Sequence, residues 1–351
     1  MTGRTLSARL EVAVEHVSAI GGDDRAMRAL VLDAIRRHVP FEAHAFLLTD
    51  PVTTVGCSPV AEVPDLSTLP DLIRLKYLTL VNRWTGLPPG GCVSLQQATG
   101  GRPEQSLLWR EHLADLGILD VASLVFTDRF GCWGFLDLWR RDTCFSADEV
   151  AALSSVGSSI TSLLRAAQAA TFTIVQTTPT PRGPGALILS PGLAVRAQTA
   201  QTRRWMSTLL PGPPERGAVP AGAYNVAAQL LAVESELDVH PAQARVHLGG
   251  GVWLTLRADR IASPEPVEHR DIVVTMEEST PTERQDIFAR AHGLTGREVA
   301  LLGHLTRGLD TRTTARLMAI TEYTVQDHLK AMFQKTATSS RRDLLAKTAG
   351  R

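Results

Sequence analysis

The chain has 351 residues, of which 44% are hydrophobic and 21% charged, and its formal net charge is zero. This composition is typical of a soluble globular protein and excludes an intrinsically disordered chain. The length favours two or three domains over a single core.

No apolar run approaches the roughly eighteen residues that a membrane span requires. The N-terminal stretch reads as an amphipathic helix that contains acidic residues, unlike a signal peptide. We therefore expect a cytoplasmic protein without membrane contacts. The four cysteines lie far apart and form no CxxC pair: Cys57, Cys92, Cys132 and Cys144. Neither a metal site nor a disulfide framework is predicted, and buried, reduced thiols are expected.

The first part of the chain predicts two helices followed by a sheet. Apolar periodicity favours helices within residues 6–39, and a strand follows at residues 43–48. Residues 50–70 read as a loop with room for one strand, residues 69–84 as a helix and residues 107–116 as a short helix. The clearest β signal is a hairpin over residues 121–140, with its turn at residues 128–131. Ser146 and Glu149 then form a capping box for a long helix that extends to about Ala170.

This order of elements, with the block from the hairpin turn at Asp128 to the capping box at Glu149, resembles a GAF domain. The resemblance implies that residues 1–172 form an α/β sensory domain, whose pocket commonly takes a small molecule. No residue indicates a cofactor. A lone helical histidine such as His112 is more often structural than a haem ligand, and three tryptophans favour a core over a cofactor cage: Trp109, Trp133 and Trp139. The long helix could pair across a dimer or cover its own sheet, and both interpretations stay open.

Residues 173–186, rich in Pro, Thr and Gly, predict a linker. After it come strand, turn, strand and helix, a loop at residues 209–220, a helix at residues 224–237, a hairpin and a last strand at residues 271–279. This order resembles a PAS domain and implies a second α/β sensor at residues 187–284. The run Gly249 to Gly251 predicts a hairpin turn, since no Lys-Ser/Thr follows as a phosphate loop requires.

Three capped helices and a fourth closing helix follow in the last sixty residues. Thr295 and Glu298 form a capping box, and Gly308 marks the end of that helix. Asp310 and Thr321 are the N-cap candidates of the next two helices. A helix, a short turn and a second helix form the scaffold that places a helix in the DNA major groove.

The third helix of this segment has two distinct faces. Apolar spacing predicts that one set faces inward: Val325, His328, Leu329 and Met332. The opposite face carries hydrogen-bonding side chains: Tyr323, Gln326, Asp327, Lys330 and Gln334. From Ala291 onward ten basic and five acidic residues give a net charge of +5, so the preceding residues carry −5. A positive terminal module is the expected footprint of a nucleic-acid-binding domain.

The same segment resembles the C-terminal DNA-binding domain of LuxR-type transcription regulators. The matching residues are Leu294, Thr295, Arg297, Glu298, Gly308, Leu309, Thr324, Val325, His328, Leu329, Lys335, Ser340 and Arg341. The resemblance implies an all-α, four-helix domain at residues 287–351. It places Gln326, Asp327 and Lys330 next to DNA bases. It also implies phosphate contacts from four residues: Arg312, Thr324, Lys335 and Arg341.

The segment departs from the family pattern at several positions. Thr313 and Thr314 stand where family members usually carry Glu-Ile, and the pair Thr336-Ala337 stands where they carry Leu-Gly. Gln326 replaces a common lysine, and Asp327 is acidic. A carboxylate beside phosphates is unfavourable unless it accepts a hydrogen bond from a cytosine amino group.

Together the patterns predict an α+β multidomain regulator of transcription. The expected partners are double-stranded DNA, a second copy of the chain in a homodimer and a small-molecule effector. The alternative is a sensory or protein-interaction regulator whose divergent helix-turn-helix does not bind DNA. An enzyme is disfavoured, since no GxSxG, HExxH, P-loop or GxGxxG motif is present in a suitable context. No catalytic residues, metal or cofactor are therefore predicted.

Overall fold

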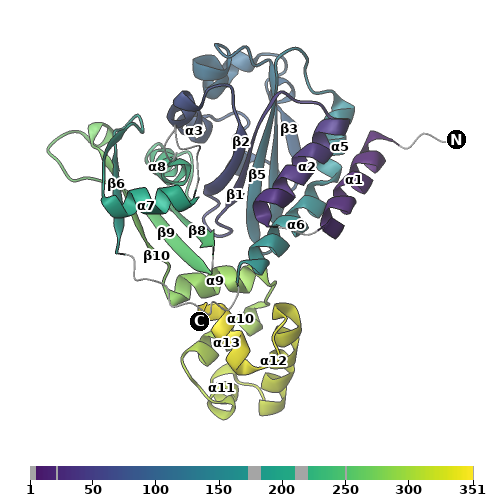
Figure 1. Cartoon of the computed structure of the whole chain (residues 1–351), viewed down its shortest axis with the longest axis vertical. Helices are drawn as coiled ribbons and strands as arrows, with labels where there is room; N and C mark the ends of the chain where they lie inside the picture. Colours follow the sequence, from purple (N-terminus) through teal and green to yellow (C-terminus); the bar gives the residue numbers. More distant parts are fainter. Residues whose placement is uncertain (1–4, 21–22, 173–182, 210–219, 250, 351) are drawn as a thin grey trace. The chain divides into compact units, whose positions relative to one another are not determined.

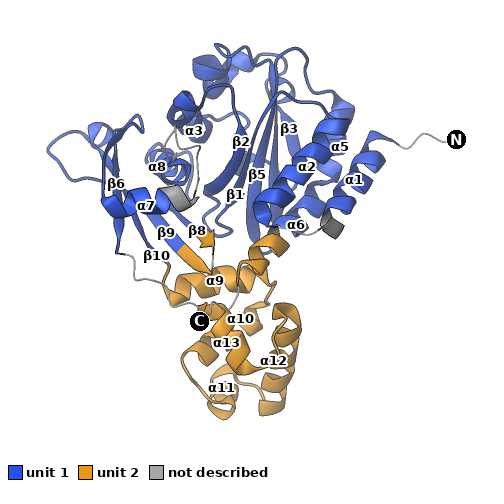
Figure 2. Ribbon diagram, viewed as in Figure 1, with its two compact units in different colours: residues 1–164, 182–246, 254–278 blue, residues 165–181, 247–253, 279–351 orange. Residues whose placement is uncertain are grey.

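The computed structural model describes residues 5–20, 23–172, 183–209, 220–249 and 251–350 (Figure 1). The chain forms two compact units, shown in different colours in Figure 2. Unit 1 consists of residues 1–164, 182–246 and 254–278, and unit 2 of residues 165–181, 247–253 and 279–351.

The first sheet of unit 1 has five antiparallel strands in the part of the chain described, in the order β2-β1-β5-β4-β3. The strands are β1 (Ala43–Thr49), β2 (Gly56–Glu62), β3 (Cys92–Ser94), β4 (Asp120–Asp128) and β5 (Gly131–Arg140). The predicted hairpin is confirmed, with Asp128 opposite Gly131 at its turn. Nearly every residue of β4 and β5 is buried, so both faces of these strands are covered.

Two predicted helices precede this sheet, α1 (Leu6–Ile20) and α2 (Asp24–His38), and both are confirmed. They pack against each other, and α1 also packs on α5 (Ala147–Ser155). Shorter elements connect the strands: α4 (Leu95–Ala98), η1 (Leu66–Thr68), η2 (Trp84–Gly86), η3 (Pro103–Gln105) and η4 (Trp109–Leu113). The last of these forms most of the short helix predicted at residues 107–116, in which Leu107 and Leu108 are α-helical and residues 109–113 are π-helical.

The helix predicted over residues 69–84 is shorter than expected. Helix α3 (Leu69–Leu78) ends at Thr79, and Asn82 then adopts a left-handed φ of 56°. The side-chain amide of Asn82 donates to the Val121 carbonyl and the Ser123 hydroxyl of β4. The chain leaves the helix early because these buried contacts fix Asn82 in a conformation that no helix allows.

The long helix predicted after residue 146 begins with the expected capping box. The Ser146 hydroxyl accepts from the Glu149 amide, and the Glu149 carboxylate accepts from the Ser146 amide. The helix is interrupted at Val156, which separates α5 from α6 (Gly157–Ala170). A Cβ atom at Gly157 would lie 2.6 Å from the Gly90 carbonyl oxygen, so the close approach requires glycine here.

By length and composition alone, Ala147–Ala170 could cross a membrane. Its most apolar side chains are buried in the fold, including Leu153, Ile160 and Leu164. The core helix of a globular protein passes the same test, so this helix is no evidence for a membrane span.

The second sheet of unit 1 repeats the topology of the first. Within the described residues its order is β7-β6-β10-β9-β8, so both sheets place their second, first, fifth, fourth and third strands side by side. The strands are β6 (Gly185–Leu189), β7 (Val195–Gln198), β8 (Gln243–Gly249), β9 (Val252–Arg260) and β10 (Ile272–Glu278). Helix α7 (Ala200–Leu209) follows β7, and η5 (Val267–His269) precedes β10. The sequence shows no repeat that would predict this shared order.

Helix α8 (Ala221–Glu234) packs between elements of both sheets. It contacts β10 of the second sheet, β2 of the first sheet and helix α3. Residues on all sides of α8 are buried: Ala221, Ala223, Tyr224, Asn225, Val226, Ala227, Ala228, Gln229 and Ala232. A helix buried on all sides must lack a charged face, and α8 carries no charge before Glu234, its last residue. Its buried side-chain amides donate hydrogen bonds, Asn225 to the Ala221 carbonyl and Gln229 to the His240 carbonyl.

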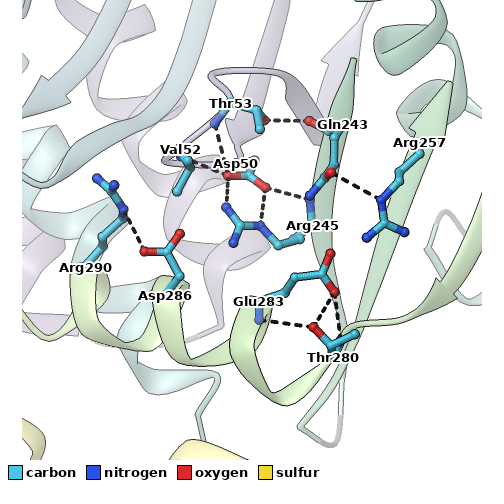
Figure 3. Close-up of polar contacts among 10 residues, drawn as sticks. All are labelled: Asp50, Val52, Thr53, Gln243, Arg245, Arg257, Thr280, Glu283, Asp286 and Arg290. Carbon is cyan, nitrogen blue, oxygen red and sulfur yellow. Dashed lines mark hydrogen bonds and ion pairs between the residues drawn. The ribbon is translucent and has the colours of Figure 1, made fainter. Parts of the chain in front are cut away.

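A buried ion pair also joins the two sheets (Figure 3). Arg245 on β8 donates from Nε and Nη2 to the two carboxylate oxygens of Asp50, at 2.7 and 2.8 Å. The Arg245 amide donates to Asp50 Oδ2, and Thr53 Oγ1 donates to the Gln243 carbonyl at 2.5 Å. Most of both predicted sensory segments therefore lies in one compact unit, whereas residues 165–172, 247–253 and 279–284 belong to unit 2. Most of the predicted linker, residues 173–182, falls outside the described residues, and the domain boundaries stay predictions.

Unit 2 contains five helices among the described residues, together with the ends of α6, β8 and β9. The five helices are α9 (Pro281–Ala291), α10 (Gly296–Thr306), α11 (Thr311–Met318), α12 (Glu322–Thr336) and α13 (Arg341–Ala349). The turn predicted at Gly249 to Gly251 includes Gly250, which lies outside the described residues. Phe172 stacks on Trp253 and meets Phe288 edge-on, with ring centroids 5.1 and 5.3 Å apart. The buried Arg284 guanidinium donates to the carbonyls of Thr348 and Gly251. Burial lowers the pKa of Arg284 to about 10.

Candidate nucleic-acid interface

The helix starts of the C-terminal module are fixed by side-chain caps. Asp310 accepts from the Thr313 amide at 2.7 Å, and Thr321 Oγ1 accepts from the Thr324 amide at 3.1 Å. Between these caps, Ala319 adopts a left-handed conformation that ends α11 and reverses the chain into α12. The predicted N-caps and the helix-turn-helix are thereby confirmed.

One face of α12 packs against the other helices of the module. Val325, Leu329 and Met332 are buried there, as are Leu301, Leu302 and Leu305 of α10 and Leu344 of α13. His328, predicted to face inward, lies at the edge of this core and is partly exposed. The apolar residues hold α12 by one side and leave the other side free for contacts.

The opposite face of α12 is exposed, as predicted. Tyr323, Gln326, Asp327, Lys330 and Gln334 all point to solvent, and so does Glu322 in the first turn. Lys330 Nζ lies 4.0 Å from Asp327 Oδ1. This face therefore offers donors and acceptors for base edges, but it also carries two carboxylates.

The residues expected to contact phosphate differ in their surroundings. Arg312 is exposed on α11, whereas Thr324 is partly exposed and shares a hydrogen bond of 2.8 Å with the Thr321 hydroxyl. Lys335 Nζ donates to both Glu298 carboxylate oxygens, at 2.9 and 2.6 Å. Arg341 Nη2 donates to the Leu309 carbonyl at 2.6 Å. Lys335 and Arg341 thus have partners inside the module, and their phosphate contacts stay predictions.

The Glu298 side chain is buried and bonded from two directions. Burial by itself would raise the pKa of Glu298, but hydrogen bonds from Lys335 and Thr295 outweigh it and hold the pKa below its usual value. The same carboxylate completes the capping box of α10 by accepting from the Thr295 amide. Lys335 therefore joins the end of α12 to the start of α10.

Arg316 is a further exposed cation on α11 that was not predicted as a phosphate contact. It follows Arg312 by four residues, so the two side chains share one face of the helix. That spacing is visible in the sequence and could have identified Arg316.

Two departures from the family pattern are structurally visible. Thr314 is fully buried, and its hydroxyl has no hydrogen-bond partner within the described residues. Thr336 is also fully buried, but its hydroxyl donates to the Met332 carbonyl at 2.8 Å. Ala337 ends α12 with φ 49° and ψ 48°, the left-handed conformation that favours glycine.

A polar network fills the space between α3 and the first sheet, where a sensory pocket would be sought. Lys76 Nζ lies 2.8 Å from Asp137 Oδ2 and donates to the Ser123 hydroxyl at 3.0 Å. Trp84 Nε1 donates to the same carboxylate, and its ring stacks on Phe135 with centroids 4.9 Å apart. Burial lowers the pKa of Lys76, although Asp137 opposes this shift. The chain's own side chains occupy this part of the interior.

Open hollows lie elsewhere in unit 1. One, of about 440 Å³, is lined by residues that include Arg196, His269 and Asp271. Another, of about 520 Å³, is lined by residues that include Arg74 and Arg260. A small-molecule effector stays a prediction, since neither hollow is enclosed by the fold.

The other candidates from the sequence are structural. Trp133 and Trp139 are fully buried core aromatics, and Trp109 donates to the Ile118 carbonyl. His112 Nε2 lies 3.2 Å from the Thr68 hydroxyl. The expectation of buried thiols is wrong for Cys144, which is exposed in the loop after β5, whereas the other three cysteines are buried. No cluster of metal-ligating side chains occurs among the described residues.

Comparison with known proteins identifies the C-terminal module. Residues 292–347 match the model of the family described as bacterial regulatory proteins, luxR family. The match extends from His292, directly after α9, into α13 and contains the whole helix-turn-helix. No curated protein sequence matches the chain significantly. The predicted LuxR-type module is confirmed. It supports DNA-binding transcription regulation as the general function of the chain.

Proposed function

We propose that this chain is a sensory transcription regulator in which unit 1 controls how the LuxR-type module meets double-stranded DNA. The observation that carries the proposal is the exposed polar face of α12, held by capped helices inside the segment that matches the family. Such a helix enters the major groove, where its side chains reach base edges. Arg312 and Arg316 on α11 would then contact the phosphate backbone.

Binding as a homodimer is part of this proposal. A module of four short helices covers only a few base pairs, so high affinity requires two copies on half-sites about one helical turn apart, roughly 34 Å. The proposed dimer acts in the cytoplasm, where the DNA is.

Sensory control is supported by the two sheets of unit 1, which share one strand order and pack into one body. We propose that they are the GAF-like and PAS-like sensors implied by the sequence. A small-molecule effector would regulate DNA binding only if it bound the DNA-competent and incompetent states with different affinity.

The alternative, a regulator that binds proteins but not DNA, is favoured by one specific observation. The exposed face of α12 carries Glu322 and Asp327, while Lys335 is already engaged by Glu298. Carboxylates repel phosphates, so this face attracts DNA less strongly than one lined by lysine and arginine.

A salt titration of DNA binding by the full chain separates the two functions. With fragmented genomic DNA, a direct DNA binder should lose affinity linearly on log-log axes, with a slope of about −0.9 for each phosphate contact. A chain that binds no DNA at low salt would decide for the protein-interaction function.

A further inference from the structure

We propose that Asp327 and Lys330 together recognise a C·G base pair in the major groove, with Asp327 accepting from the cytosine amino group and Lys330 donating to guanine. This inference rests on the proposed function, because it assumes that α12 enters the groove. It assigns a base identity to a site whose target sequence is otherwise unknown.

The first argument is position. The Lys330 and Asp327 side chains are 74% and 50% exposed, and both extend from the face of α12 opposite Val325 and Leu329. An exposed pair with 4.0 Å between Nζ and Oδ1 contributes little to helix stability. Each group therefore has hydrogen-bonding capacity left for a partner outside the chain.

The second argument is charge. On the exposed face of α12, Glu322 and Asp327 oppose the single ammonium group of Lys330 within the described residues. The remaining lysine of the helix, Lys335, is held by Glu298. Phosphate attraction alone would not favour a carboxylate in this place. Asp327 can approach DNA favourably only where a base donates a hydrogen bond to it.

The third argument is the pattern of groups on the base edges. In the major groove only the amino groups of cytosine and adenine donate hydrogen bonds. The adenine N6 amino group lies between two acceptors, its own N7 and the thymine O4, and both would repel a carboxylate. The cytosine N4 amino group has an acceptor on one side only, the guanine O6 of its own pair. Asp327 should therefore prefer cytosine.

Lys330 supplies the complementary half of the pattern. Guanine presents the acceptors O6 and N7, which are the usual partners of a lysine ammonium group. The 4.0 Å between the two side-chain groups is close to the roughly 3.4 Å between stacked base pairs. One C·G pair, or a cytosine beside a guanine at the next step, can therefore engage both groups at once.

The test is selection of binding sites from random DNA by the full chain, followed by affinity measurements on the selected site. We expect a cytosine at one fixed position of each half-site. Replacing that C·G pair with T·A should weaken binding by the wild-type chain roughly tenfold or more, because thymine O4 faces the carboxylate. In Asp327→Ala the same replacement should cost several-fold less affinity, because only the Lys330 contact with guanine then distinguishes the two pairs.

Glu322→Gln is the matched control, since it removes one exposed carboxylate from the first turn of the same helix. It should raise affinity for all sequences and keep the full preference for cytosine. Selection of sites without a fixed cytosine, or a preference that Asp327→Ala leaves undiminished, would overturn the inference while DNA binding itself persists. If no variant binds DNA at low salt, the proposed function fails, and the inference fails with it.

Discussion

Two buried threonines of the C-terminal module differ in whether their hydroxyl groups are hydrogen-bonded. Thr336 Oγ1 donates to the Met332 carbonyl, whereas Thr314 Oγ1 has no partner within the described residues. A buried hydroxyl without a partner loses its hydration without compensation. Thr314 stands where the family usually has an apolar side chain, so this module retains a destabilising polar atom in its core.

Thr314→Val should therefore raise the free energy of unfolding by about 1 kcal/mol, since the change removes only the unpaired hydroxyl. Thr336→Val is the matched control and should lower stability by about 1 kcal/mol, because it removes a bonded hydroxyl. Urea unfolding of both variants, followed by circular dichroism, measures the two changes. Equal shifts of the same sign would refute the assignment.

His292, at the end of α9, predicts a pH dependence of stability. Burial, with a smaller contribution from Lys347, lowers the pKa of His292 to about 4 from its usual 6.5. Between these two values the unfolded chain binds more protons than the folded chain, so stability falls as the pH falls. The stability that neutral His292 contributes is fully present above pH 6.5. It is lost as the pH falls from 6.5 to about 4, by up to about 1.4 kcal/mol for each pH unit.

Urea unfolding of the wild type and of His292→Gln at pH 7 and pH 5 checks this prediction. The variant should lose less stability between the two pH values than the wild type does. His16, an exposed histidine on α1, offers the control variant His16→Gln, which should follow the wild type. A wild-type loss that persists in His292→Gln would assign the pH dependence to another group.

At the scale of elements, the ion pair between Lys335 and Glu298 joins the end of α12 to the start of α10. Because Glu298 also completes the α10 capping box, loss of Lys335 leaves a buried carboxylate without its cation. A buried charge that loses its partner is costly, whereas an exposed arginine such as Arg312 contributes little to stability.

Lys335→Ala should therefore lower the stability of the module by roughly 1–3 kcal/mol, and Arg312→Ala by less than about 0.5 kcal/mol. Thermal unfolding measures the first effect, and DNA affinity at a temperature where both variants are folded measures the second. Weak DNA binding by folded Arg312→Ala, with stability unchanged, would support a phosphate contact. A Lys335→Ala variant as stable as the wild type would contradict the structural role of this lysine.

Local signals predicted the elements best. The caps at Ser146, Thr295, Asp310 and Thr321 could be read from the sequence because each cap bonds within its own helix turn. The early end of α3 and the need for glycine at position 157 could not, since Asn82 bonds to β4 and Gly157 packs against Gly90, both distant in the chain. The exposed face of α12 followed from helical periodicity.

The site was less predictable than its scaffold. Lys335 bonds to Glu298, and Arg341 bonds to the Leu309 carbonyl. Each partner lies more than thirty residues away in the chain. Periodicity gives no information on such pairs. The packing of the two sheets was also missed, although the absence of charged residues in α8 before Glu234 was a signal for burial on all sides.

At the scale of the whole molecule, unit 1 is held together across its two sheets by the Asp50–Arg245 pair. Both groups are almost completely buried, and Asp50 also accepts from the amides of Val52 and Arg245. Asp50→Asn keeps the shape but removes the negative charge that faces the buried Arg245 guanidinium. We expect a loss of roughly 3–5 kcal/mol in the free energy of unfolding.

Calorimetry of the full chain measures this loss as a shift in Tm. Asp271→Asn is the control, because Asp271 forms an exposed pair with Arg196 at 4.0 Å and its loss should change Tm little. If Asp50→Asn melts at the wild-type temperature, the pair does not stabilise the joined sheets.

The position of α8 in the chain also determines the order of events during synthesis. The last strand of the first sheet ends at Arg140, whereas α8 begins only at Ala221. At translation rates of about 5–20 residues per second, the ribosome needs roughly 4–16 s to make the intervening stretch. During that interval the sides of α3 and β2 that α8 later covers are open to other nascent chains. A ribosome-bound chain that has exposed β5 but not yet α8 should therefore bind chaperones. This binding should stop once α8 has emerged from the ribosome.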